Sequence, residues 1–484
     1  MKKHLFLTAL LLTPLAALRA AESPKPAGKP NIVYILADDL GYGDVHCLGG
    51  ARSRILTPNL DRLAAAGMTF TEAHACASVC TPSRYSILTG RYNWRSYLQK
   101  GVLADNRPPL ITAGRLTVPA LLKQHGYHTA AIGKWHLGFT LEGKYKDLPG
   151  LKLMGAPLGA VTGNGPLTRG FDEFFGYDRL TEAPTSMFEK DRVTQLVKPV
   201  DLLPVIVKRA TESMADRSKA GQPFFLYLAL NSPHTPLVPT RDWKGKSGLG
   251  AYGDFVMETD WAVGEVLAAL EKNGGSDNTL VFFTSDNGCA PYIGVKELEA
   301  KGHFPSEHRR GYKSDIWDGG HRIPFIARWP GKVKPGTTSD QLVCLIDFMA
   351  TCADLLGAKL PDNAGEDSVS ILPALLGTAN KPLREVVVHH SIQGNFAIRD
   401  GNWKLELCRG SGGWSKGGDA APIQLYDMKK DVGERTNEYK AHPEIVAKLT
   451  KLLEKYVAEG RSTPGTPQKN DTQVSLHAKS RRRQ

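Results

Sequence analysis

Short apolar runs alternate with amphipathic stretches along most of the chain. Five runs are almost continuously apolar, as expected for strands that are covered on both faces of a sheet. These runs span 31–37, 127–132, 223–230, 279–284 and 323–327. Helical periodicity between them predicts helices at 57–67, 117–125 and 252–272, with Thr57 and Thr117 at the start of the first two. Strands that alternate with helices indicate an α/β protein with a doubly wound parallel sheet.

The pattern changes near residue 380. Four short, closely spaced strands predict a small antiparallel sheet, at 386–389, 395–399, 403–407 and 424–426. Apolar residues recur at helical spacing over 443–460 and predict a closing helix. We therefore expect a large domain at 28–380, a smaller C-terminal α+β domain at 381–470, and a basic disordered tail at 471–484.

Polar clusters follow four of the five apolar runs. In chain order they contain Asp38 and Asp39, then Lys134 and His136, then His234, then Asp286 and Asn287. Each cluster alone also fits an ordinary turn. In open α/β sheets, however, ligands bind beyond the carboxyl ends of the strands, so this fold would gather the clusters at one edge.

The acidic members of these clusters predict a metal site. Asp38, Asp39, Asp286 and Asn287 all offer oxygen ligands, and no CxxC pair or histidine cluster competes with them. Oxygen-only coordination selects a hard cation, Ca²⁺ or Mg²⁺.

Cys80 is followed by residues that are typical of a helix start, in the sequence Cys80-Thr81-Pro82-Ser83-Arg84. Thr81 is a candidate cap and Pro82 suits the first helical position, so Cys80 would lie at the positive end of a helix dipole. With Arg84 one turn further on, this is a place to stabilise an anion. The alternative is a structural cysteine before an ordinary capped helix.

This motif, continued by Leu88-Thr89-Gly90-Arg91, resembles the signature of the type I sulfatases. Two further segments resemble that family, 133–138 with Lys134 and His136, and 310–322 with Lys313. The similarity runs from Asn31 to about Asn470 and implies an alkaline-phosphatase-like fold. The segment 170–176 also resembles the family, and we assign it to packing.

The resemblance implies a role for each matching residue. Cys80 would be converted to formylglycine by a formylglycine-generating or anaerobic sulfatase-maturing enzyme, and its hydrate would attack sulfur. One Ca²⁺ would bind Asp38, Asp39, Asp286, Asn287 and the modified Cys80. Arg84 and Lys134 would hold the nucleophile and the sulfate, His234 and Lys313 would assist the leaving alcohol, and His136 would take a proton as sulfate is released.

The amino terminus predicts export. A basic start and an apolar run from Leu5 to Leu18 indicate a signal peptide over residues 1–20, which directs the protein to the periplasm or outside the cell. No later segment is long enough to span a membrane, so no stable membrane insertion is expected. The net charge of +12 would suit a polyanionic substrate, and with no nucleic-acid-binding motif we expect no nucleic-acid partner. Seven cysteines leave six beside Cys80, and their pairing stays open.

The substrate is predicted only as a class. A sulfated saccharide fits the resemblance, and the segments 94–111 and 460–465 favour 6-sulfated galactose or N-acetylgalactosamine at a chain end. Trp94, Asp318 and His321 are candidate sugar-binding residues. The alternatives are a phosphate or phosphonate monoester hydrolase of the same fold, and a sulfated-glycan-binding protein without catalysis.

Overall fold

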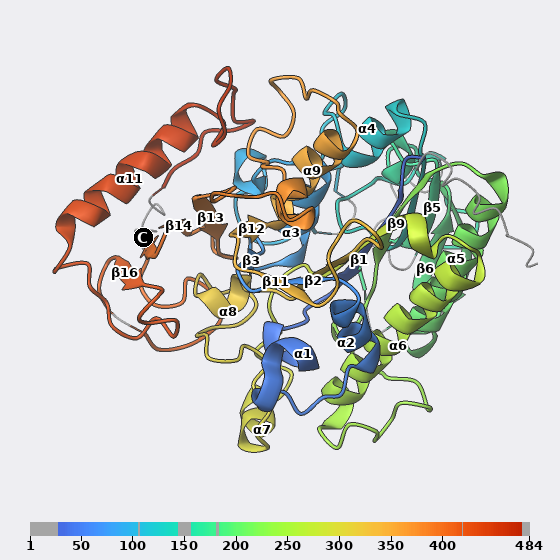
Figure 1. Ribbon diagram of the computed structural model, residues 1–484, viewed down its shortest axis with the longest axis horizontal. Helices are drawn as coiled ribbons and strands as arrows, with labels where there is room; N and C mark the ends of the chain where they lie inside the picture. Colours follow the sequence, from blue (N-terminus) through green and yellow to red (C-terminus); the bar gives the residue numbers. More distant parts are fainter. Residues whose placement is uncertain (1–27, 105–106, 144–155, 181–182, 419, 477–484) are drawn as a thin grey trace, which may run out of the picture.

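A computed structural model describes residues 28–104, 107–143, 156–180, 183–418 and 420–476. A large mixed sheet crosses the molecule, and a smaller sheet lies to one side of it (Figure 1). The strand order in the large sheet is β11-β2-β10-β9-β1-β8-β4-β5-β6-β7. The predicted signal peptide lies outside the described residues.

The centre of the large sheet is formed by four of the predicted apolar runs. They are β1 (Asn31–Ala37), β4 (His128–Lys134), β8 (Phe224–Ala229) and β9 (Thr279–Ser285). All four run parallel, with β1 between β8 and β9 and with β4 beyond β8. Their side chains are almost all buried because helices cover both faces, as the absence of polar alternation predicted.

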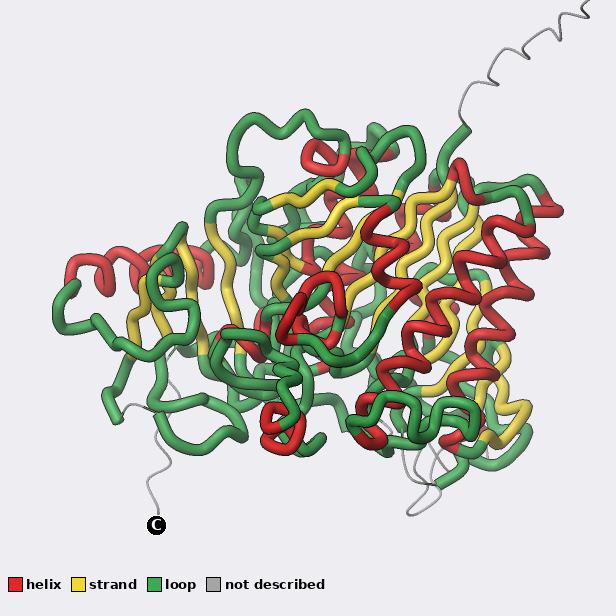
Figure 2. The backbone as a smooth tube through the Cα atoms, turned by 60° about the horizontal axis from the view of Figure 1, so that its bottom comes forward, coloured by secondary structure: helices red, strands yellow, loops and turns green. Residues whose placement is uncertain are grey.

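Successive residues of β1 face opposite cores. Ile32, Tyr34 and Leu36 belong to one core, and Val33, Ile35 and Ala37 belong to the other. The helices α3 (Cys80–Thr89), α4 (Val118–Gln124) and α9 (Phe348–Leu355) contribute to the first core. The helices α2 (Pro58–Ala65), α5 (Pro199–Ala220) and α6 (Gly250–Lys272) contribute to the second, and they run alongside the strands in Figure 2. The α/β prediction is therefore confirmed.

The sheet is mixed, because the fifth predicted strand does not run parallel to the other four. β10 (Phe325–Arg328) runs antiparallel to β9, so the chain enters it from the end at which the neighbouring strands leave. The segment 170–176, assigned to packing, leads into a further parallel strand, β5 (Glu173–Tyr177). The remaining strands of the sheet are β2 (Met68–Phe70), β6 (Thr185–Glu189), β7 (Arg192–Val197) and β11 (Thr337–Ser339).

Short elements connect these layers. The short helices are α1 (His46–Gly49), α7 (Val295–Ala300), α8 (Asp318–His321) and α10 (Leu372–Leu375). A two-stranded sheet joins β3 (Ala73–His74) to β12 (Val343–Cys344).

The smaller sheet has the predicted antiparallel order. Its strands are β13 (Val386–His390), β14 (Phe396–Asp400), β15 (Trp403–Glu406) and β16 (Gln424–Asp427). The helix α11 (Pro443–Ala458) packs on it through Leu449 and Leu453. The same core includes Tyr92 and Trp94 from the large domain, so the two parts share an apolar interior.

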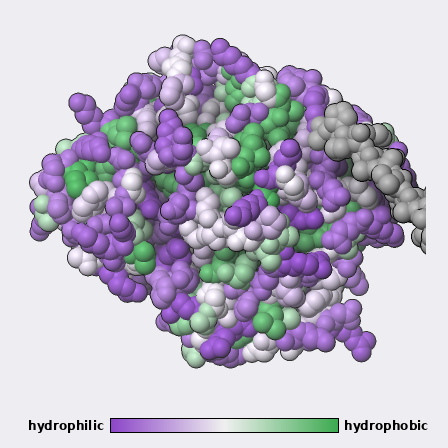
Figure 3. Space-filling view, viewed as in Figure 1, coloured by the Kyte–Doolittle hydropathy of each residue, from purple (hydrophilic) through white to green (hydrophobic). Residues whose placement is uncertain are grey.

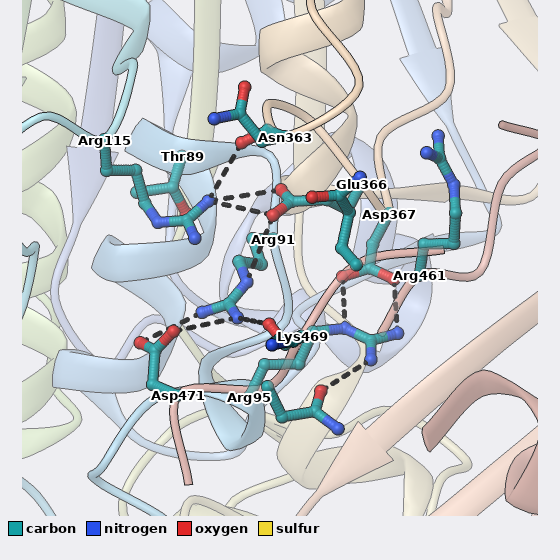
Figure 4. Close-up of polar contacts among 12 residues, drawn as sticks. Thr89, Arg91, Arg95, Arg115, Asn363, Glu366, Asp367, Arg461, Lys469 and Asp471 are labelled. Carbon is teal, nitrogen blue, oxygen red and sulfur yellow. Dashed lines mark hydrogen bonds and ion pairs between the residues drawn. The ribbon is translucent and has the colours of Figure 1, made fainter. Parts of the chain in front are cut away.

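A set of paired charges, buried except at its solvent edge, joins the C-terminal segment to the chain beyond α3 (Figure 4). We call it the clasp and define it as Arg91, Arg95, Arg115, Glu366, Asp367 and Asp471. Arg95 binds both oxygens of Asp367, at 2.8 Å each, and Arg91 binds both oxygens of Asp471, at 3.1 and 3.2 Å. Arg115 binds Glu366 at 3.0 and 3.3 Å.

The clasp changes where the predicted tail begins. Asp471 is held by Arg91, and Thr472 donates a hydrogen bond to the carbonyl of Ser96. Val474 and Leu476 pack against the apolar core between the smaller sheet and α11, which we call the third core. The prediction of a disordered tail from residue 471 is therefore wrong for 471–476, and 477–484 lie outside the described residues.

One face of the molecule is mostly hydrophilic, with small apolar patches scattered over it (Figure 3). Within the described part of the chain, no helix combines the length and the apolar character that crossing a membrane requires.

Candidate active site

The carboxyl ends of β1 and β9 bring four oxygen-bearing side chains together. Ala37 and Ser285 are paired in the parallel register, so Asp38 and Asp39 follow one strand beside Asp286 and Asn287 on the next. The amide of Asp39 donates to Oδ1 of Asp286 at 3.2 Å, and Asn287 Nδ2 donates to Oδ1 of Asp39 at 2.8 Å. All four side chains are buried.

Three basic side chains surround these oxygens. Arg84 reaches Oδ2 of Asp286 through Nε at 3.1 Å and through a terminal nitrogen at 2.7 Å, and it also donates to the carbonyl of Lys134. Lys134 Nζ donates to Oδ2 of Asp38 at 2.5 Å. Lys313 Nζ donates to Oδ2 of Asp39 at 2.6 Å. The chain thus balances three buried aspartates with three cations from distant segments.

Cys80 is the first residue of α3, which begins earlier than predicted. Val79 holds the N-cap position, and Thr81 does not cap the helix because its Oγ1 accepts from the amide of Leu103 at 3.2 Å. Thr57 likewise makes no cap hydrogen bond to α2, whereas Thr117, the predicted start of α4, accepts a cap hydrogen bond from the amide of Ala120. Placing Cys80 in the first turn of α3 sets its side chain beside free helix N–H groups.

His136 is the polar partner of Cys80. Its Nδ1 lies 3.2 Å from the sulfur, and its Nε2 lies 3.2 Å from the carbonyl oxygen of Leu103. Since a carbonyl only accepts, Nε2 carries the hydrogen and Nδ1 of the neutral ring is the acceptor for the thiol. Burial, together with Lys134, lowers the pKa of His136, and burial raises the pKa of Cys80. Unmodified Cys80 is therefore a neutral thiol and a poor nucleophile.

His234 completes the cluster from the end of β8. Its Nε2 lies 3.6 Å from Oδ2 of Asp39, and its Nδ1 lies 2.5 Å from the carbonyl oxygen of Thr235. Burial, with Lys313 nearby, lowers the pKa of His234 to about 4.

The backbone is strained where it delivers these groups. Asp39 and His136 have φ of 67° and 51°, a left-handed conformation that is costly for residues other than glycine. At Gly133 a Cβ would lie 1.9 Å from the carbonyl oxygen of Ala229, so only glycine lets β4 approach β8 so closely just before Lys134. Such strain persists where the surrounding structure fixes the residue for a function.

Of the oxygens on Asp38, Asp39, Asp286 and Asn287, two accept no hydrogen bond from a described residue, Oδ1 of Asp38 and Oδ1 of Asn287. Oδ1 of Asp38 lies 3.4 Å from a terminal nitrogen of Arg84. Burial alone would raise the pKa of Asp38, but Lys134, His234 and Arg84 outweigh it and hold that pKa well below its usual range. An ionised carboxylate oxygen and an amide oxygen, both buried and both lacking a donor, suit a hard cation. Asp38, Asp39 and His234 also lie close enough together to hold a metal ion.

The sequence matches a known family across the part of the chain that builds this cluster. The sulfatase family profile covers residues 30–358. The chain belongs to the sulfatase family. Sulfatases are sulfuric ester hydrolases, and this chain is one of them. A second profile, described as N-sulphoglucosamine sulphohydrolase, C-terminal, covers residues 306–459 and includes the smaller sheet.

Individual sulfatases are similar over most of their length. An N-acetylgalactosamine-6-O-sulfatase of Bacteroides thetaiotaomicron is 33% identical, with 88% of this chain and 93% of the relative covered. Human arylsulfatase A is 34% identical, with 91% and 89% covered. A solved structure from work on glycosaminoglycan metabolism by B. thetaiotaomicron is 31% identical and has a TM-score of 0.75. The alignment covers 88% of this chain and 99% of the solved chain. The sulfatase has the alkaline-phosphatase-like fold that its sequence predicted.

The structure brings together ten of the predicted residues and leaves three apart. Eight of them form one contact network, Asp38, Asp39, Arg84, Lys134, His234, Asp286, Asn287 and Lys313. Cys80 and His136 contact each other beside this network, within reach of the charges of Lys134 and Lys313. Trp94 is 1% exposed and stacks on Tyr92 in the third core of the sulfatase. Asp318 is 1% exposed and paired with Arg322.

His321 is fully buried against the carbonyl of Ala75 and the ring of His389. Trp94, Asp318 and His321 therefore offer a sugar almost no surface. The three guesses rested on the presence of a suitable residue type near a motif, which does not reveal whether the side chain faces solvent.

Sequence reasoning missed the residues that shape the turn at His136. Asp178 follows β5, accepts from the amide of His136 on its carbonyl at 3.0 Å, and accepts from the amide of Gly138 on Oδ1 at 3.2 Å. An acidic residue directly after an apolar strand is the same signal that identified Asp38 and Asp286. It was overlooked because the segment 170–176 was assigned to packing.

Proposed function

We propose that this protein is an exported sulfatase that hydrolyses sulfate esters on sulfated glycans through a formylglycine formed from Cys80. The observation that carries the proposal is the place of Cys80 at the start of α3, 3.2 Å from His136 and within the field of Lys134 and Lys313. A neutral buried thiol is a poor nucleophile. The surrounding cations would bind a sulfate dianion or a sulfate monoester.

The oxygens of Asp38, Asp39, Asp286 and Asn287 would hold one Ca²⁺. When bound, the cation would supply Lewis-acid stabilisation of negative charge beside residue 80. Asp38 Oδ1 and Asn287 Oδ1 support this assignment because both are buried and neither accepts a hydrogen bond from a described residue. The hydrated aldehyde at residue 80 would supply the nucleophilic oxygen.

The chain's own groups would then act from fixed positions. Arg84, held on Asp286, and Lys134, held on Asp38, would orient the sulfate and offset its charge. His136 would take a proton at Nδ1, because Nε2 is committed to the carbonyl of Leu103. Lys313, bound to Asp39, would stabilise the departing alcohol oxygen. His234, whose Nδ1 hydrogen faces the carbonyl of Thr235, would assist through Nε2 when that atom is protonated.

For the substrate we propose a saccharide 6-sulfate, with galactose or N-acetylgalactosamine as the sugar. The relative named N-acetylgalactosamine-6-O-sulfatase supports this choice, since it aligns with 88% of this chain.

Two measurements test the proposal. Peptide mass analysis across Cys80, after expression with a maturing enzyme, should show the conversion of the thiol to an aldehyde. The matured protein should release sulfate from 6-sulfated sugars and should act much more slowly on the matching 6-phosphates. Equal rates on phosphate esters, or full sulfatase activity with an unmodified thiol, would reject the proposal.

A further inference from the structure

Two exposed aromatic rings meet beside the candidate active site. Tyr292 is 51% exposed and Trp414 is 45% exposed, although large aromatic side chains are usually mostly buried. Their ring centroids are 6.0 Å apart and the rings are tilted by 44°. The two residues come from different domains, so tertiary structure alone creates the pair.

Trp414 stands on a loop that is fastened to the catalytic domain. Its amide donates to Oγ of Ser314 at 2.9 Å and to Oδ1 of Asp315 at 3.1 Å. Ser415 donates to the same carboxylate through its amide at 3.1 Å and through its hydroxyl at 2.5 Å. One carboxylate therefore fixes the backbone on both sides of the Trp414 ring.

The approach of this loop depends on Gly413. A Cβ at that position would lie 2.4 Å from the carbonyl oxygen of Ser314, so any larger residue would push the loop away. Gln393 Nε2 also donates to the carbonyl of Gly413 at 3.0 Å. A backbone this firmly held, carrying an indole ring that remains exposed, indicates that the ring serves something other than packing.

Tyr292 connects the pair to the site. Asp39, Lys313 and Thr235 lie near enough to its hydroxyl to act on the pKa of Tyr292. Lys313 is bound to Asp39, and the carbonyl of Thr235 contacts His234. The aromatic pair thus lies on the side of Lys313 and His234, where the oxygen of the departing alcohol must emerge.

We propose that Tyr292 and Trp414 form a stacking surface for the pyranose ring that carries the sulfate. The inference rests on the proposed function and identifies the residues that would recognise its substrate. The C–H face of a sugar ring packs well on an aromatic face, and binding sites combine such apolar walls with a few directed polar groups. The sugar would lie on the two rings while its sulfate enters the basic cluster.

Equilibrium binding tests this surface independently of maturation and turnover. In a Cys80→Ala background, the Kd for 6-sulfated N-acetylgalactosamine and 6-sulfated galactose would be measured by calorimetry. Adding Trp414→Ala should raise the Kd about tenfold or more, and Trp414→Phe should restore most of the affinity. The Kd for inorganic sulfate should not change. Leu196→Ala removes another exposed apolar side chain, on β7, and should leave all three Kd values unchanged.

Several outcomes would overturn the inference. They are unchanged saccharide affinity in Trp414→Ala, an equal loss of affinity for inorganic sulfate, and no binding of either sugar by the parent protein. A melting temperature equal to that of the parent excludes misfolding of the variant. If the matured wild-type protein releases no sulfate while Trp414→Ala still weakens sugar binding, the proposed catalysis fails and the stacking surface stands.

Discussion

An ionic cluster lies at each end of α3. The two clusters contain the same number of charges but pair them in different ways. At the first turns of α3 lie Asp38, Asp39 and Asp286 with Lys134, Lys313 and Arg84, the last of these on the helix itself, and beyond its last turn lies the clasp. Each cluster sets three carboxylates against three cations. In the clasp, every carboxylate oxygen contacts a guanidinium.

In the clasp, the buried atoms without a hydrogen bond to a described residue are Nε of Arg91 and Nε of Arg115. The candidate catalytic cluster differs in the kind of atom. It leaves Oδ1 of Asp38 and Oδ1 of Asn287 without a hydrogen bond, uses two lysines, and holds Asp39 and His136 at positive φ. Bidentate arginine pairs fix geometry, whereas lysine is a compact charge on a flexible stem that can serve a ligand. The comparison teaches that burial and charge alone do not mark an active site. Buried acceptor oxygens without a hydrogen bond and backbone strain are the distinguishing signs.

The largest expected difference between the two ends of α3 concerns Cys80. Cys80→Ala should lower sulfate release by about 10⁴-fold or more, because the nucleophile can no longer be formed. Its melting temperature should stay close to that of the wild type. Sulfate release by matured protein and thermal unfolding would be measured together, with the exposed Cys47→Ala as the matched control. Substantial turnover by Cys80→Ala would contradict the assignment.

Arginine substitutions should separate stability from catalysis. Arg95→Met should lower the free energy of unfolding by about 3–5 kcal/mol, because it leaves Asp367 buried without its partner. The kcat/KM of the folded protein should be unchanged. Arg84→Met also removes a buried partner, but it should in addition lower kcat/KM by about 10²-fold or more.

Urea unfolding and sulfate-release kinetics below the unfolding transition would measure both effects. A fall in kcat/KM in Arg95→Met as large as that in Arg84→Met would erase the distinction between the clusters.

Cation binding should stabilise the protein through the catalytic cluster only. Ca²⁺ at about 100 times its Kd should add about 2.7 kcal/mol to the free energy of unfolding of chelator-treated protein. Asp38→Asn should lose most of this gain, and Asp367→Asn should keep it although its starting stability is lower. Thermal unfolding with and without Ca²⁺ gives the answer for all three proteins. An undiminished gain in Asp38→Asn would place the cation elsewhere.

The smallest effect is expected at the solvent edge of the clasp. Asp471 is partly exposed, and Arg91 keeps Glu366 and the carbonyl of Lys469 as partners. Asp471→Asn should therefore cost only about 1 kcal/mol, with kcat/KM and the Ca²⁺ response unaltered. Urea unfolding would detect this loss. A loss as large as that of Arg95→Met would show that the C-terminal segment, and not the inner pair, dominates the clasp.

The sequence predicted the parts of the fold that local patterns determine. The sequence predicted the apolar strands β1, β4, β8 and β9 and the polar residues that follow them. It also predicted that these polar residues would meet, because the carboxyl ends of parallel strands lie at one edge of a sheet. The direction of β10 was not readable, since an apolar run has the same composition in either orientation. The predicted cap of α3 was also wrong. The hydroxyl of Thr81 accepts a hydrogen bond from the amide of Leu103, which lies more than twenty residues later in the sequence.

Long-range contacts explain the other misses. Trp94 looks like a binding residue in the sequence and is a core residue in the structure, where it meets Tyr92 and Phe396. Trp414 looks like part of a glycine-rich loop and becomes half of an aromatic pair through contacts with Ser314 and Asp315. Solvent exposure depends on the complete tertiary structure, and no local pattern records it.

The clasp also sets an order of events during synthesis. Arg91 and Asp471 are 380 residues apart, so the ribosome needs roughly 20–80 s to make the second after the first. Cys80 is only 3% exposed in the finished structure, which leaves an enzyme little access to its thiol. On the proposed function, we expect Cys80 to be modified before the chain folds around it, and the clasp cannot form until Asp471 has been made.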